Sequence, residues 1–155
     1  KTTPQQEAVK TFKKSFSKYD KACQNILYFM MNDSKFIVRF QKELGYFNEK
    51  KYRNIANEII YYYEIKKDID LGAFISFIST KDYIVDDAME IIKIGQNIDF
   101  DMKAFDEFIG VAKQEMLKQE IKDLKVKIAN SMDANEEMEL AKQLINLKKG
   151  CVGNE

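Results

Sequence analysis

The stretch "DANEEMELAKQLINLKKG", residues 133–150, predicts one short helix that carries two apolar stripes. The methionine stripe contains Met138, Ala141 and Ile145, and the leucine stripe contains Leu140, Leu144 and Leu147. A helix on the surface of a globular protein needs only one such stripe to face the core. The second stripe therefore indicates a contact beyond the one that holds the helix in place.

The segment before this stretch supplies a partner for one of the stripes. We expect a long helix that begins near Asp99 or Asp101 and runs to about residue 131. Its second half carries apolar residues at spacings of four, three and four, the rhythm of a helix that packs against one other helix: Leu117, Ile121, Leu124 and Ile128. The turn at residues 130–133 is short, so the two helices should run antiparallel as a hairpin.

We expect the methionine stripe, with Met138, Ala141 and Ile145, to pack on the long helix, which leaves the leucine stripe without a neighbour in the hairpin. Burial of one leucine side chain gains roughly 1.5–3 kcal/mol, so three leucines in water favour association. Two interpretations follow. Either the hairpin folds back onto the rest of the chain, or the leucine stripe, flanked by Lys148 and Lys149, lies in a groove of another protein.

Turn and capping residues divide the preceding part of the chain into several helices with short connections. Residues 32–34, Asn-Asp-Ser, end one helix and cap the next, which ends at Gly45. Asn48 and Asp70 are placed to cap two further helices, and Gly95 to end another. The expected fold is therefore all-α: a multi-helix bundle followed by a protruding two-helix antiparallel hairpin.

These signals predict four regions along the chain. Residues 1–16 form an N-terminal helix or linker, whose start is marked by Thr3 and Pro4. Residues 17–113 form the bundle, residues 114–150 the hairpin and residues 151–155 a tail. The chain begins at Lys1 without an initiator methionine, and we expect it to be part of a longer protein.

Two clusters of residues within the bundle raise functional alternatives. Tyr61, Tyr62 and Tyr63 would suit a platform on which nucleic-acid bases stack. Consecutive helical positions point about 100° apart, however, which favours one core tyrosine and two half-buried ones, and we expect Tyr63 to be the inward one. Asp86 and Asp87 are adjacent carboxylates, but the same divergence keeps them from converging on one metal ion.

The composition narrows the functional classes. Basic and acidic residues number 25 each, which argues against a dedicated nucleic-acid binder, because such proteins need a basic excess to neutralise phosphates. Histidine is absent, so the commonest general base and metal ligand is missing. Cys23 and Cys151 have no CxxC spacing, which favours a reduced cytoplasmic protein with Cys23 in the core. No apolar run is long enough for a membrane span.

The helix order resembles that of the C-terminal helicase-binding domain of bacterial DnaG-type DNA primases. The segments that carry the likeness are "YDKACQNILYFMMNDSKFIVRFQKELGYFNEKKYRNIANEIIYYYE", residues 19–64, and "DIDLGAFISFIS", residues 68–79. The pattern is a helix that ends in a double apolar residue and Asn-Asp, a helix that ends at Leu-Gly, and a long helix rich in Tyr and Ile. The likeness spans roughly residues 17–150 by helix order and spacing.

The N-terminal domain of DnaB-type replicative helicases is similar to the same pattern. That domain usually opens with a first helix richer in alanine and glycine, which "ACQNILYFMMND" lacks. This departure favours the primase domain. The helicase collar domain stays as the alternative, and a binder of single-stranded nucleic acid through residues 61–63 as a third hypothesis.

The resemblance implies a non-catalytic module that docks primase on the N-terminal domains of the hexameric replicative helicase, recruits it to the replication fork and modulates both activities. It implies that the hairpin makes much of the contact, and the expected docking residues are Met138, Leu140, Leu144, Ile145, Leu147 and Lys148. It also implies that primer synthesis, a nucleotidyltransferase reaction with zinc and magnesium, resides in other domains. For this chain we expect no catalytic residue, no metal ligand, no cofactor, no direct nucleic-acid contact and no membrane contact.

Overall fold

The computed structural model describes the backbone of residues 16–153 and the side chains of residues 16–150. This part of the chain is all-α, with seven helices and no strand, and confirms the predicted multi-helix fold. The helices are α2 (Lys18–Asn32), α3 (Ser34–Glu43), α4 (Lys50–Lys66), α5 (Leu71–Ile78), α6 (Val85–Gly95), α7 (Met102–Ala129) and α8 (Ala134–Gly153). The predicted N-terminal helix lies outside the described residues, whereas the backbone at residues 151–153, where a tail was expected, continues α8.

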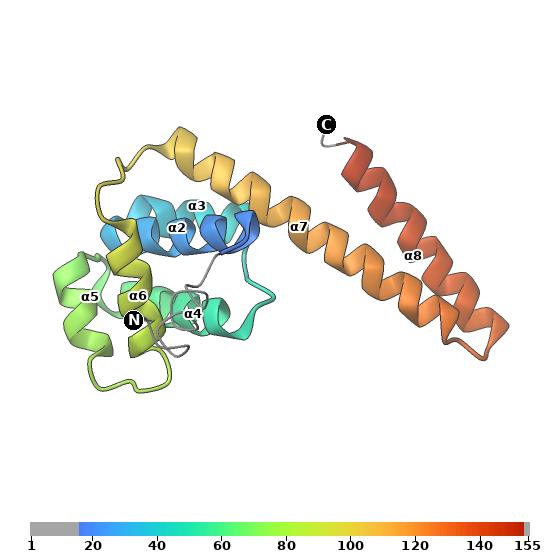
Figure 1. The fold of residues 1–155 in the computed structure, drawn as a ribbon, viewed down its shortest axis with the longest axis horizontal. Helices are drawn as coiled ribbons and strands as arrows, with labels where there is room; N and C mark the ends of the chain where they lie inside the picture. Colours follow the sequence, from blue (N-terminus) through green and yellow to red (C-terminus); the bar gives the residue numbers. More distant parts are fainter. Residues whose placement is uncertain (1–15, 154–155) are drawn as a thin grey trace, which may run out of the picture.

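Helix α2 is the centre of the bundle, and α3, α4, α5, α6 and α7 all pack against it (Figure 1). Its sequence explains the central position, because apolar residues cover most of the circumference of the helix. Nine of the ten residues from Ala22 to Met31 are buried. Cys23 is one of them and is a free, buried thiol, as predicted. Phe29 lies in the middle of this core, where its ring contacts rings from α3 and α7.

Most of the predicted helix boundaries are confirmed by capping contacts. Asp33 accepts a hydrogen bond from the backbone N–H of Lys35 at the start of α3, and Asp70 does the same for Ala73 in α5. Gly45 has a φ of 84°, in the left-handed region that suits glycine after a helix. The prediction for α4 was wrong by one residue: Glu49, not Asn48, is the N-cap, and its side chain makes no capping hydrogen bond.

The three consecutive tyrosines of α4 do not form a stacking platform. Tyr62 is the buried member, where its ring packs against Phe74 and Phe77 of α5. Tyr63 is half-buried and Tyr61 is exposed. One core tyrosine was expected among the three, but the expected inward position was Tyr63. The interior of α4 is set by Tyr52, Ile55 and Ile59, and Tyr62 continues that stripe at a spacing of three.

Gly95 at the end of α6 is required by a close approach to α2. A Cβ atom added at Gly95 would lie 2.4 Å from Cδ2 and 2.5 Å from Cγ of Tyr28. Because Tyr28 is itself buried, its ring has little room to move away. The backbone of α6 therefore rests directly on the Tyr28 ring.

Gly95→Ala is expected to lower the free energy of unfolding by about 1–3 kcal/mol, the usual cost of overpacking a filled core. Urea unfolding followed by the helical circular dichroism signal measures this loss. Gly72→Ala is the matched control, because its new methyl group would make only an ordinary contact of 3.5 Å with Asp70. Equal stability losses in the two variants would contradict the close packing of Gly95 on Tyr28.

Candidate protein-docking site

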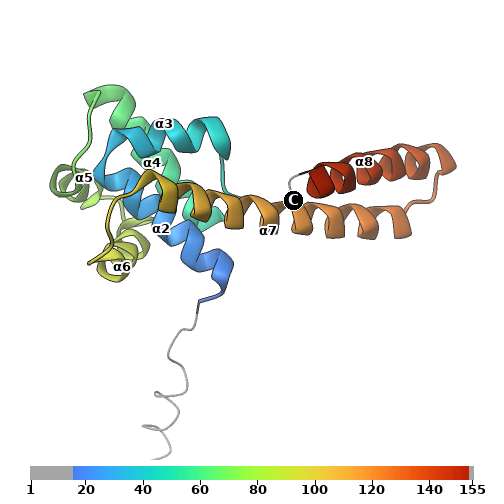
Figure 2. The same ribbon diagram turned by 90° about the horizontal axis from the view of Figure 1, so that it is seen from above.

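Helix α7 leaves the bundle halfway along its length. Its first half lies on α2 and α3, and there Phe105, Ile109 and Ala112 are buried. Its second half projects beyond the other bundle helices, as both views of the ribbon show (Figures 1 and 2). The helix is continuous from Met102 to Ala129, so Gly110 does not break it. Residues 113–129 therefore form an arm that carries α8.

Helix α8 runs back along this arm in the antiparallel direction, and α7 is its main neighbour (Figure 2). The arm residues Leu117, Ile121 and Ile128 are half-buried and Leu124 is buried, as expected for the side that faces α8. At the turn, the carboxylate of Asp133 accepts a hydrogen bond from the backbone N–H of Asn135, which caps the start of α8. The two helices thus share one thin apolar seam.

The structure reverses the predicted roles of the two α8 stripes. The leucine stripe is half-buried toward α7, whereas Met138 and Ile145 of the methionine stripe are 60% and 53% exposed. Ala141 lies between the two stripes and is half-buried. The physical reason is the apolar area that each stripe can bury. Three leucines remove more apolar surface from water than a methionine, an isoleucine and an alanine, because the alanine side chain is small. The expectation that the leucine stripe is unfilled was therefore wrong.

The exposed side of α8 combines apolar and basic side chains. Met138, Lys142, Ile145 and Lys149 are spaced four, three and four residues apart, so they share one side of the helix, here called the outer α8 face. All four are exposed, and Lys142 forms an ion pair with Glu139 at 3.5 Å. Lys148 is also exposed, but its spacing from Ala141 places it at the edge of this face. Sequence reasoning named Met138, Ile145 and Lys149 but missed Lys142, which the same spacing could have found.

A cavity of about 300 Å³ lies where the hairpin meets the bundle. Met116 and Leu117 of α7 line it together with Leu147 of α8, and Leu44 and Tyr46 from the end of α3 close the bundle side. The C-terminal half of α8 is thus near the bundle without filling the space between them. Tyr46 was not predicted as part of the site, because nothing in its local sequence indicates which distant helix it faces.

Gly110 lies on the exposed side of α7, shortly before the arm begins. A Cβ atom added there would meet nothing within 4 Å, so no close contact requires glycine at this position. Gly110→Ala is expected to raise the free energy of unfolding by about 0.5–1 kcal/mol, because alanine loses less conformational freedom in a helix. Thermal unfolding measures the gain, and a lower midpoint in the variant would show that α7 needs glycine here.

Comparison with known proteins adds no assignment: no protein-family model and no curated protein matches this chain. In the part of the chain that the structure describes, no three or more Cys, His, Asp or Glu side chains are grouped so that they could hold a metal ion. Among the helices of residues 16–153, none is both long and apolar enough to cross a bilayer.

Proposed function

We propose that this chain is a non-catalytic docking module of a bacterial DnaG-type primase that binds the N-terminal collar of the hexameric replicative helicase. The observation that supports this proposal best is the outer α8 face on an arm that stands clear of the bundle. Met138 and Ile145 each expose more than half of their surface and do not pack into the seam with α7. An apolar pair framed by lysines is the pattern of a helix that lies in a groove of a partner protein.

The apolar and the basic side chains of the outer α8 face would contribute to such an interface in different ways. Met138 and Ile145 are the anchors, because burial of each gains roughly 1.5–3 kcal/mol. Lys142 lies between the two anchors and Lys149 one turn beyond Ile145, and such exposed charges steer association and alter its salt dependence more than its strength. The module would thus bring primase to the opening duplex and modulate both enzymes.

Leu144 is unsuitable as a test of docking, although the sequence alone favoured it. Its side chain is half-buried in the seam between α7 and α8, so Leu144→Asp would place a charge in the seam and separate the two helices. Lost binding in that variant would report on the hairpin as a whole. Substitutions at Met138 and Ile145 change the outer α8 face alone.

Light scattering after size-exclusion chromatography tests the proposal and separates it from the helicase-collar alternative. The chain alone should elute as a monomer of 18.2 kDa, and it should co-elute with the replicative helicase when the two are mixed. A collar domain would instead assemble into dimers or rings on its own. A monomer that fails to join the helicase would contradict the proposal.

A further inference from the structure

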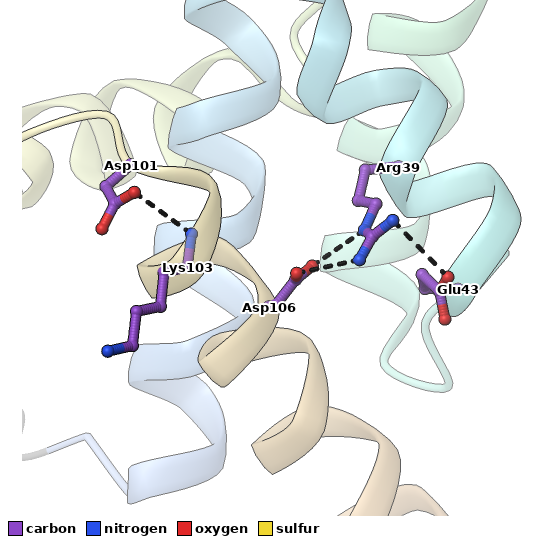
Figure 3. Close-up of polar contacts among 5 residues, drawn as sticks. All are labelled: Arg39, Glu43, Asp101, Lys103 and Asp106. Carbon is purple, nitrogen blue, oxygen red and sulfur yellow. Dashed lines mark hydrogen bonds and ion pairs between the residues drawn. The ribbon is translucent and has the colours of Figure 1, made fainter.

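Arg39 of α3 and Asp106 of α7 form a two-pronged ion pair at the base of the arm (Figure 3). Nε of Arg39 donates to Oδ1 of Asp106 at 2.9 Å, and Nη2 donates to Oδ2 at 2.9 Å. Nη1 of Arg39 lies 3.9 Å from Oε1 of Glu43, one turn further along α3. The guanidinium is therefore held on both sides, which fixes its plane and the plane of the Asp106 carboxylate.

Aromatic contacts also hold α7 on the bundle near the base of the arm. Phe105 packs against Phe36 of α3, with ring centroids 5.0 Å apart, and against Phe29 of α2 at 5.9 Å. Such contacts bury much apolar surface and hold α7 on the bundle strongly, but none of them is a hydrogen bond or an ion pair. A bidentate ion pair accepts only a narrow range of orientations. Arg39 and Asp106 therefore add a strongly directional polar contact between α3 and α7 beside these rings.

The ion pair lies far from the hairpin turn, so a small tilt of α7 at the pair moves the turn by a larger distance. Asp106 lies about two helical turns before residue 113, where the arm begins. From Gly110 to Ala129 the helix extends roughly 30 Å, so a tilt of about 10° at the base moves the hairpin turn by about 5 Å. A weak contact at the base can thus control where the outer α8 face is presented.

We propose that Arg39 and Asp106 are positioning residues that set the direction of the hairpin relative to the bundle, and through it the affinity for the partner. The effect on affinity rests on the proposed function, whereas the effect on the direction of the hairpin does not. The pair is about one-third exposed on each side, so its loss should leave the fold intact. What changes is the spread of orientations that the arm adopts.

The test is a pulsed electron paramagnetic resonance distance between spin labels at Thr80→Cys in the bundle and Lys127→Cys in the arm. Both positions are exposed, Cys23 is buried, and Cys151→Ser removes the other thiol. The otherwise unchanged chain should give one narrow distance distribution, and Asp106→Asn should broaden it about two-fold. The swapped pair Arg39→Asp with Asp106→Arg should restore the narrow distribution, which a merely destabilising substitution would not do. An equally narrow distribution in Asp106→Asn overturns the inference.

The affinity for the replicative helicase distinguishes this inference from the proposed function. Asp106→Asn should weaken binding about two- to five-fold, the range expected for one exposed ion pair, and the swapped pair should recover it. A broadened distribution with unchanged affinity overturns the link between direction and binding. If the chain with native Arg39 and Asp106 does not bind the helicase at all, the proposed function is overturned, whereas the distance measurement still decides the positioning role.

Discussion

Phe29→Ala is expected to lower the free energy of unfolding by about 3–5 kcal/mol, the cost of removing a large side chain from a filled core. Phe29 is fully buried, and its ring centroid lies 5.0 Å from that of Phe36, 5.9 Å from Phe105 and 5.7 Å from Phe108. It therefore joins α2 to both α3 and α7. Because whole domains are stable by only about 5–15 kcal/mol, this one substitution removes a large share of the total.

Urea unfolding measured by circular dichroism tests this expectation, since the chain has no tryptophan. Phe100→Ala is the matched control: its ring also contacts Phe29, at 5.1 Å, but 41% of the residue is exposed. Its loss should be less than half that of Phe29→Ala, because it leaves a smaller cavity behind. A Phe29→Ala protein as stable as the Phe100→Ala protein would show that α2, α3 and α7 do not meet at this ring.

The double variant Met138→Asp with Ile145→Asp is expected to weaken helicase binding at least about 30-fold, the effect of removing two anchors from an interface centre. The helical circular dichroism signal should be unchanged, because both side chains face water in the free chain. Fluorescence anisotropy of the labelled chain, titrated with helicase, measures the affinity.

Val126→Asp is the control for this variant. Val126 is 54% exposed and lies on the same hairpin, but its spacing from Leu124 and Ile128 turns it away from α8. It therefore adds one of the two charges of the double variant, at a similarly exposed apolar position that is not on the outer α8 face. Its affinity for the helicase should stay within about two-fold of that of the parent. If Val126→Asp alone abolished binding, the docking surface would lie on α7 and the proposed face would be wrong.

Local signals made the helices of the bundle predictable. Asp33, Asp70 and Asp101 each accept a hydrogen bond from the first turn of the helix they precede, and this chemistry depends only on neighbouring residues. Gly45 is a local signal of the same kind. Apolar periodicity in α7 likewise identified the side that faces α8. Features set within a few residues of the chain were therefore accessible before the structure was known.

Contacts between helices could not be predicted from these local signals. Both stripes of α8 have suitable spacing, and which one faces α7 depends on the apolar area that each can bury against that distant helix. The contact between Arg39 and Asp106 joins residues 67 positions apart, so no local pattern indicates it. Gly95 had been explained as a helix end, but its close approach to Tyr28 is a contact between two helices. In each case the deciding neighbour is distant in sequence.

The most direct test of the docking face is methyl NMR of the full chain labelled at its methionines, recorded with and without the helicase N-terminal domain. The seven methionines report on different places, because Met30 and Met31 are buried in the bundle, Met89 is exposed on α6 and Met138 lies on the outer α8 face. Addition of the helicase domain should shift or broaden the Met138 signal selectively and leave those of Met30, Met31 and Met89 in place. A Met138 signal that stays unchanged at saturating helicase domain would contradict docking through this face.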